Sequence, residues 1–404
     1  MNLIKLSWNN LIAKPLSTLL SLLLLILGVS IISLLLMLNK QMNDTFLRNI
    51  EGIDMVVGAK GSPLQLILSS VYHIDNPTGN IHMDEALGLS RNPIIEKAIP
   101  LAYGDSYKSY RIVGTDTSYV NHYQAKIANG RLWEAPFEVT LGTKVARILG
   151  LEVGDEFFGS HGLLDDNNVH EVHPYKVVGI LSPSNSVLDQ LILTGISSVW
   201  GVHEEHKGGD EKAHDGEEEV IEVKREITAL LVKFRNKGRG LFMPRMINEN
   251  TSMQAALPAI EINNLRDNLG LGIVILQGVA LAIIFISGMS VFISLYNALK
   301  DRKYEIALMR SMGASRIQLF VMVMLEGLFL ALLGLLLGIV ASRIGLIALS
   351  AYASDNYHYD FAVFVFQPEE FILFFASLGI GLLAATIPAI QAFNTNISQT
   401  LADA

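Results

Sequence analysis

Histidine and carboxylate side chains gather in one stretch of the chain, where together they could bind a metal ion. His203, His206 and His214 are interspersed with acidic residues from Glu204 to Asp215. Imidazole and carboxylate are ligands that zinc and similar ions accept. The stretch is also rich in glycine and like charges, which is typical of a solvated insertion, and a tight site needs partners that orient its ligands. We therefore expect weak zinc binding at these histidines, and no other directly bound cofactor.

Glu326 is the one ionisable residue in the apolar run of residues 317–342. An ionisable group inside a membrane is costly, which makes this residue a candidate for proton or substrate handling. A hydrogen bond inside a helix bundle is the alternative, and we favour that structural role.

No arrangement typical of an enzyme stands out. Residues 56–63 contain two glycines and a lysine, but the G-x-x-x-x-G-K-[ST] string of a Walker A phosphate loop occurs nowhere in the chain. A G-x-S-x-G nucleophile elbow is also missing. The chain has no cysteine, which excludes disulfides and thiolate metal sites. The protein is therefore predicted not to be an enzyme, and to have no ATP site of its own.

A short basic segment between two apolar runs is the best candidate for contact with a partner. Residues 303–316 read K-Y-E-I-A-L-M-R-S-M-G-A-S-R and follow a helical pattern. Gly313 is placed to end one helix, and Ser315 with Gln318 matches the capping box that starts another. The spacing predicts a contact helix held close to a membrane.

Four apolar runs each exceed the roughly 20 residues that cross a bilayer as a helix. They cover residues 15–39, 268–299, 317–342 and 371–401. Basic residues precede the first run and gather between the second and third, so the positive-inside rule predicts that both termini are cytoplasmic. Residues 40–270 then lie outside, and residues 41–270 carry 31 acidic and 21 basic side chains. This acidity argues against nucleic acid as a partner.

The predicted fold class is a membrane protein with four transmembrane α-helices plus a large α+β extracytoplasmic domain. Strands are expected at residues 110–114, 175–181 and 229–234, and a helix at 143–149. The predicted segments are an interfacial amphipathic helix at 1–14, transmembrane helices at 15–39, 271–298, 316–342 and 369–393, the extracytoplasmic domain at 40–270, a cytoplasmic coupling helix at 299–315, a short outer loop at 343–368 and a cytoplasmic tail at 394–404.

Three segments carry a resemblance to a known family. E-I-A-L-M-R-S-M-G-A-S-R at residues 305–316, followed by L-E-G at 325–327, resembles the coupling region of the MacB/FtsX-like ABC transporter permeases. Residues 139–155 and 175–181 are similar to the extracytoplasmic domain of that family. The resemblance implies an outer domain of two lobes, the distal one at about residues 101–222. It also implies a bacterial inner membrane location, a homodimer, and a separate cytoplasmic ABC ATPase subunit that binds the ATP.

The function implied by this resemblance is mechanotransmission. ATP hydrolysis in the separate subunit would move the extracytoplasmic domain for export or extraction of cargo, with membrane lipid around the helices and an adaptor or cargo-binding protein outside. The alternatives are a signalling or scaffold subunit that regulates an extracytoplasmic enzyme, and a zinc-linked transporter component. The candidate coupling residues include Lys303, with Glu305 and Arg310 at the subunit contact, Ile306 and Met309 for packing, and Gly313 for the turn.

Overall fold

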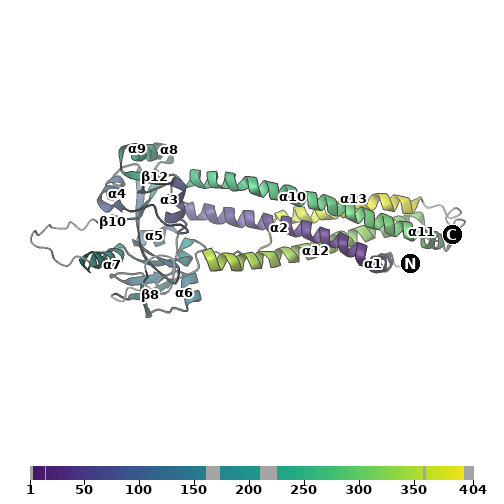
Figure 1. Ribbon diagram of the computed structural model, residues 1–404, viewed down its shortest axis with the longest axis horizontal. Helices are drawn as coiled ribbons and strands as arrows, with labels where there is room; N and C mark the ends of the chain where they lie inside the picture. The colour runs from purple at the N-terminus through teal and green to yellow at the C-terminus, as the bar shows by residue number, and fades with distance from the viewer. Residues whose placement is uncertain (1–2, 14, 161–172, 210–224, 358–360, 395–404) are drawn as a thin grey trace, which may run out of the picture. The chain divides into compact units, whose positions relative to one another are not determined.

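The computed structural model describes residues 3–13, 15–160, 173–209, 225–357 and 361–394. The chain divides into two compact units, a helical bundle of residues 1–43 and 268–404 and an outer domain of residues 44–267. Figure 1 shows the long helices of the bundle running alongside one another. Each unit has its own hydrophobic core.

Among the described residues, four helices are long and apolar enough to cross a membrane. Two of them, α2 and α10, continue into the outer domain, and α12 remains helical through the first part of the predicted outer loop at 343–368. The helices that form or enter the bundle are α1 (Leu3–Ala13), α2 (Pro15–Ile50), α10 (Pro258–Asp301), α11 (Lys303–Ser311), α12 (Arg316–Tyr357) and α13 (Glu369–Phe393).

Small residues let the bundle helices approach closely. A Cβ atom at Gly381 would lie 2.5 Å from the Cβ of Ala331, and one at Gly334 would lie 2.8 Å from the Cβ of Leu25. Only glycine allows such approaches, which are common where helices pack in membranes. Gly379, by contrast, has open space where a Cβ would stand. Glycines therefore fit α12 closely against both α2 and α13.

A buried ion pair joins α12 to the first turn of α13. Arg343 donates two hydrogen bonds to the Glu370 carboxylate, at 2.8 and 2.9 Å, and Ser33 of α2 donates a third at 3.0 Å. The Glu370 side chain is fully buried, whereas the neighbouring Lys40–Glu369 pair is partly exposed. Charges out of water need such complete pairing.

We expect Arg343→Leu to destabilise the bundle strongly, because it leaves the Glu370 carboxylate buried without its charged partner. Loss of one member of a buried pair costs about 3–5 kcal/mol. Lys40→Leu is the matched control, since an exposed pair contributes about 0–1 kcal/mol. Thermal unfolding of the detergent-solubilised protein measures both variants, and equal losses of stability would contradict the prediction.

The outer domain is built on one mixed sheet with the strand order β12-β1-β11-β3-β4-β9-β6-β8-β5, and β7 pairs with β8. Strands β10 and β2 form a separate two-stranded sheet. The strands are β1 (Met55–Ala59), β2 (Ile81–His82), β3 (Ile95–Tyr107), β4 (Tyr110–Thr115), β5 (Ile127–Gly130), β6 (Glu138–Leu141), β7 (Glu156–Phe157), β8 (Tyr175–Leu181), β9 (Ile192–Gly195), β10 (Glu226–Ile227), β11 (Ala229–Phe234) and β12 (Met253–Ala256). The helices are α3 (Pro63–Ser70), α4 (Met83–Ser90), α5 (Thr117–His122), α6 (Thr143–Leu149), the 3-10 turn η1 (Val187–Gln190), α7 (Ile196–Gly209), α8 (Lys237–Gly240) and α9 (Met243–Asn250).

Strand β3 connects the two halves of this sheet. Its first part pairs with β11 and its second part with β4, and the register shifts between Tyr103 and Ser106. The pairs β4–β9 and β6–β8 are parallel, and the other pairs are antiparallel. The predicted α+β class is confirmed. The predicted strands at 175–181 and 229–234 and the predicted helix at 143–149 are also confirmed. The strand predicted at 110–114 extends one residue further, to Thr115. One continuous sheet therefore runs through the region expected to form two lobes.

The last turns of α2 are fixed within the outer domain. The hydroxyl groups of Tyr72 and Tyr123 each donate a hydrogen bond of 2.9 Å to the carbonyl oxygens of Phe46 and Asn49. Carbonyls at a helix C-terminus lack partners inside the helix, so these bonds satisfy them. The first turns of α10 are held by packing, because Ile262 is buried in the hydrophobic core that also contains Tyr72. Both helices are thus anchored in the outer domain.

A buried histidine lies in this domain between two tyrosine hydroxyl groups. His73 contacts Tyr103 through Nδ1 at 2.7 Å and Tyr119 through Nε2 at 2.8 Å. Tyr103 donates its hydroxyl hydrogen to the Ser69 carbonyl, so Nδ1 of His73 donates and Nε2 accepts. Burial, helped by the positive charge of Arg111, holds the pKa of His73 well below its usual 6.5. The imidazole is therefore neutral.

We expect the outer domain to lose stability in acid. Because the folded protein keeps His73 neutral, the unfolded chain binds the extra proton first as pH falls. This contribution to stability is complete above pH about 6.5 and decreases below it, by up to about 1.4 kcal/mol per pH unit. Burial also lowers the pKa of His122. Thermal unfolding followed by tryptophan fluorescence, to which Trp133 and Trp200 of the outer domain contribute, should show a shallower pH dependence for His73→Gln. An unchanged slope would contradict this.

Candidate coupling site

The turn that joins α11 to α12 is built as the sequence predicted. The Gly313 N–H bonds the Arg310 carbonyl at 3.0 Å and the Ala314 N–H bonds the Met309 carbonyl at 3.0 Å. With Gly313 at a φ of +100°, these bonds form a Schellman cap. The predicted capping box is also confirmed, since Ser315 N–H bonds Gln318 Oε1 at 2.8 Å and Gln318 N–H bonds Ser315 Oγ at 3.2 Å. Hydrogen bonds therefore define the end of α11 and the start of α12.

One face of α11 packs into the bundle. Ile306 is 2% exposed and packs in a cluster with Leu319 of α12 and Ala389 of α13, and the partly buried Met309 lies against the same cluster. Both residues therefore pack within the same chain, and their role in coupling stays a prediction.

The opposite face of α11 presents apolar side chains to the surroundings. Tyr304 is 52% exposed, Leu308 is 45% exposed and Met312, in the turn that follows, is 80% exposed. Their spacing of four residues places them along one side of the helix. Lys303 and Glu305 are exposed beside them. We call Tyr304, Leu308 and Met312 the outer face of α11. Sequence reasoning missed this face, although its i, i+4, i+8 spacing was visible.

A buried polar cluster lies where α10 meets α11. Arg302, the residue between these two helices, donates a hydrogen bond of 2.7 Å to the Asn10 carbonyl and lies 3.6 Å from the Glu326 carboxylate. The Asn10 side-chain amide donates to Glu326 at 2.6 Å. The structural hydrogen bond favoured for Glu326 is confirmed. We call Asn10, Arg302 and Glu326 the polar joint, because it connects α1, the α10–α11 junction and α12.

The helices of the polar joint lie together at one end of the bundle. In Figure 1, α1 and α11 lie at the same end of the bundle as the chain's N-terminus. Ser7 of α1 also donates a hydrogen bond of 3.0 Å to the Met322 carbonyl of α12. The N-terminal segment predicted as interfacial therefore packs against α12, with Ile4 and Ile12 exposed. A displacement of α11 would act directly on these contacts.

The predicted zinc ligands are only partly described. The backbone at His203 and His206 belongs to α7, and His214 lies outside the described residues. Within the described ranges, no group of three or more histidine or acidic residues is arranged to hold a metal ion. Zinc binding at these three histidines stays a prediction.

The four candidate membrane spans, together with the α+β outer domain, define a multi-span membrane protein. The profile of the MacB-like periplasmic core domain matches residues 18–234, more than half of the chain, and that of the FtsX-like permease C-terminal domain matches residues 278–397. The chain belongs to the MacB/FtsX-like ABC transporter permeases. It is thus a permease component of an ABC transporter, a family that works with a cytoplasmic ABC ATPase.

Two solved structures show some similarity to this chain. The periplasmic region of MacB from Actinobacillus actinomycetemcomitans aligns at 15% identity and a TM-score of 0.34, covering 55% of this chain and 97% of that one. The extracellular domain of the noncanonic ABC-type transporter YknZ from Gram-positive bacteria aligns at 11% identity and a TM-score of 0.30, covering 50% and 98%. No curated protein matches the chain.

Proposed function

We propose that this permease is a mechanical transmitter in a bacterial cytoplasmic membrane, with both termini and α11 on the cytoplasmic side. Two copies pair, and each rests α11 on a separate ATPase subunit. ATP-driven movement of the ATPases displaces α11, and the long helices pass that displacement to the outer domains, which export or extract cargo. Membrane lipid surrounds the helices, and an adaptor or cargo-binding protein is the expected outer partner.

The two-sided character of α11 carries this proposal. Its inner face is packed through Ile306 and joined through Arg302 to two other helices, while its outer face is apolar and exposed. Exposed apolar side chains next to charged ones are typical of a docking surface. The continuous helices α2 and α10, whose ends are anchored in the outer domain, support transmission over a distance.

The proposal is tested by ATP hydrolysis with and without the partner subunit. The purified chain alone should release no phosphate from ATP. An ABC ATPase of the same host should release phosphate, at a rate that changes when it is reconstituted with this chain. Phosphate release by the chain alone, with contaminating ATPases removed, would refute the division of labour between subunits.

Gly313→Val gives a sharper test of coupling. A Cβ atom at this position meets no atom within 4 Å, so only the left-handed backbone is penalised, by roughly 1–2 kcal/mol. The variant should insert normally, and its complex with the ATPase subunit should hydrolyse ATP without moving the outer domain. Normal coupling in this variant would show that the turn after α11 has no role in transmission.

A further inference from the structure

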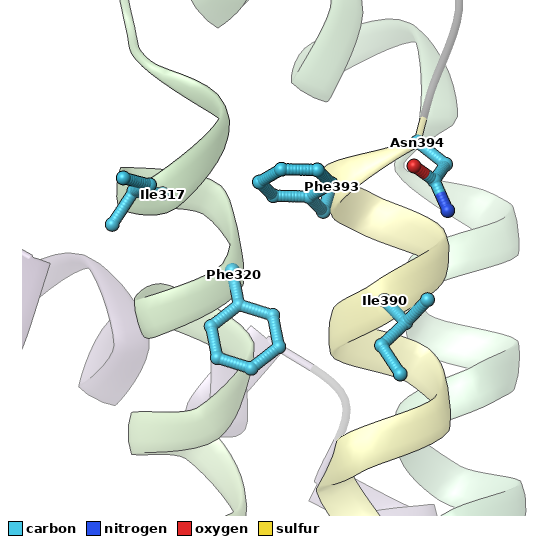
Figure 2. A pocket seen from close by; sticks show the side chains of 5 residues that line it. All are labelled: Ile317, Phe320, Ile390, Phe393 and Asn394. Atoms are coloured by element: carbon cyan, nitrogen blue, oxygen red, sulfur yellow. The ribbon is translucent and has the colours of Figure 1, made fainter.

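An apolar pocket lies between the start of α12 and the end of α13. It has a volume of about 410 Å³ and is lined by Ile317, Phe320, Ile390, Phe393 and Asn394. Figure 2 shows the Phe393 ring pointing from α13 toward α12. The volume falls within the range of about 300–1,000 Å³ found for small-molecule sites.

The pocket opens beyond the closest approach of the two helices. Further along the bundle, a Cβ at Gly327 would lie only 2.8 Å from the Gly381 carbonyl oxygen, so the helices are in close contact there. At the pocket, aromatic and branched side chains replace the glycines. Both helix ends belong to candidate membrane spans, so the pocket lies at one edge of the predicted hydrocarbon layer.

A cation lies beside this apolar lining. The Arg316 guanidinium lies 5.9 Å from the centroid of the Phe393 ring, and Arg316 is exposed. The lining contains no acidic residue, and in the part of the chain that the structure describes no carboxylate forms an ion pair with Arg316. The Asn394 amide adds a neutral hydrogen-bonding group. Apolar surface with an adjacent cation at a membrane edge is complementary to a lipid that has an anionic headgroup.

We propose that this pocket binds an anionic phospholipid. One acyl chain lies against Phe320, Ile390 and Phe393, and the phosphate lies at Arg316. This lipid site goes beyond the proposed function. Only the placement of the lipid in the cytoplasmic leaflet rests on the membrane orientation proposed above. Lipid binding does not require the ATPase subunit, so failure of one proposal leaves the other testable.

Native mass spectrometry of the full detergent-solubilised chain tests the headgroup. Phosphatidylglycerol should bind in preference to phosphatidylcholine, and Arg316→Gln should reduce that preference about fivefold, the effect of one basic residue near an anionic surface. Lys300→Gln is the matched control, because it removes an equal charge from the exposed end of α10. Equal binding of the two lipids, or equal effects of the two variants, would overturn the proposal.

A second measurement locates the lipid, using the absence of cysteine from the chain. A fluorophore at Ile390→Cys should be quenched more by brominated phosphatidylglycerol than by brominated phosphatidylcholine in proteoliposomes. Leu383→Cys, at a 75% exposed position on the same helix, should show no such preference. Equal quenching by the two brominated lipids at Ile390→Cys would overturn the proposal. So would a fluorophore that is protected from quenching only when the ATPase subunit is added.

Discussion

Leu308→Glu is expected to abolish functional assembly of this permease with its ATPase subunit while leaving the bundle intact. Leu308 is 45% exposed on the outer face of α11, so a carboxylate there faces no steric penalty in the isolated chain. In the complex the same carboxylate would be buried against the partner. Loss of one buried leucine costs about 1.5–3 kcal/mol, and an unpaired charge adds to that cost. Binding should weaken at least about thirtyfold, since 1.4 kcal/mol corresponds to tenfold.

The measurement is the dissociation constant of the ATPase subunit from the solubilised permease, together with the unfolding temperature of each variant. Ile4→Glu is the matched control, because Ile4 is 63% exposed on α1 and lies outside the outer face of α11. Ile306→Ala provides the opposite case: its side chain is 2% exposed, so it should lower bundle stability by about 2–5 kcal/mol. Normal ATPase binding by Leu308→Glu would exclude this face as the docking surface.

Glu326→Ala is expected to have the second large effect, on stability and on coupling together. It removes the carboxylate that faces the Arg302 guanidinium, whose side chain is only 13% exposed. An uncompensated charge of this kind costs about 3–5 kcal/mol. The Asn10 amide also loses its acceptor at 2.6 Å. Thermal unfolding of the variant should therefore begin well below that of the unmodified protein.

A double variant separates the structural role of the polar joint from its role in coupling. Arg302→Met combined with Glu326→Leu removes both charges, and replacing a buried ion pair by apolar residues is often neutral for stability. We expect stability to recover, while ATP-driven movement of the outer domain, followed by a pair of introduced labels, stays impaired. The reason is that Arg302 no longer connects the α10–α11 junction to α1 and α12. Recovery of both properties would show that the joint is purely structural.

Local patterns in the sequence were sufficient for several features formed by neighbouring residues. The cap at Gly313 and the box from Ser315 to Gln318 depend on groups within five residues of one another, so spacing alone specifies them. Strand β8 at Tyr175–Leu181 and helix α6 at Thr143–Leu149 likewise follow from periodicity and flanking residues. The four spans follow from uncharged length, because no other spanning element satisfies its backbone in lipid.

Features that join distant segments were decided by the tertiary structure. Nothing near Asn10 or Arg302 in the sequence indicates that they meet at Glu326, since Asn10 is 316 positions away from it. The division of α11 into a packed and an exposed face also depended on which neighbours cover it, so Ile306 is buried while Leu308 is free to meet a partner. The predicted outer loop at 343–368 is helical as far as Tyr357, and Arg343, the charge at which the predicted span ended, lies within hydrogen-bonding distance of Glu370. A hydropathy pattern predicts that a membrane segment ends at a charged residue. Only the tertiary structure shows where a residue of opposite charge pairs with that residue.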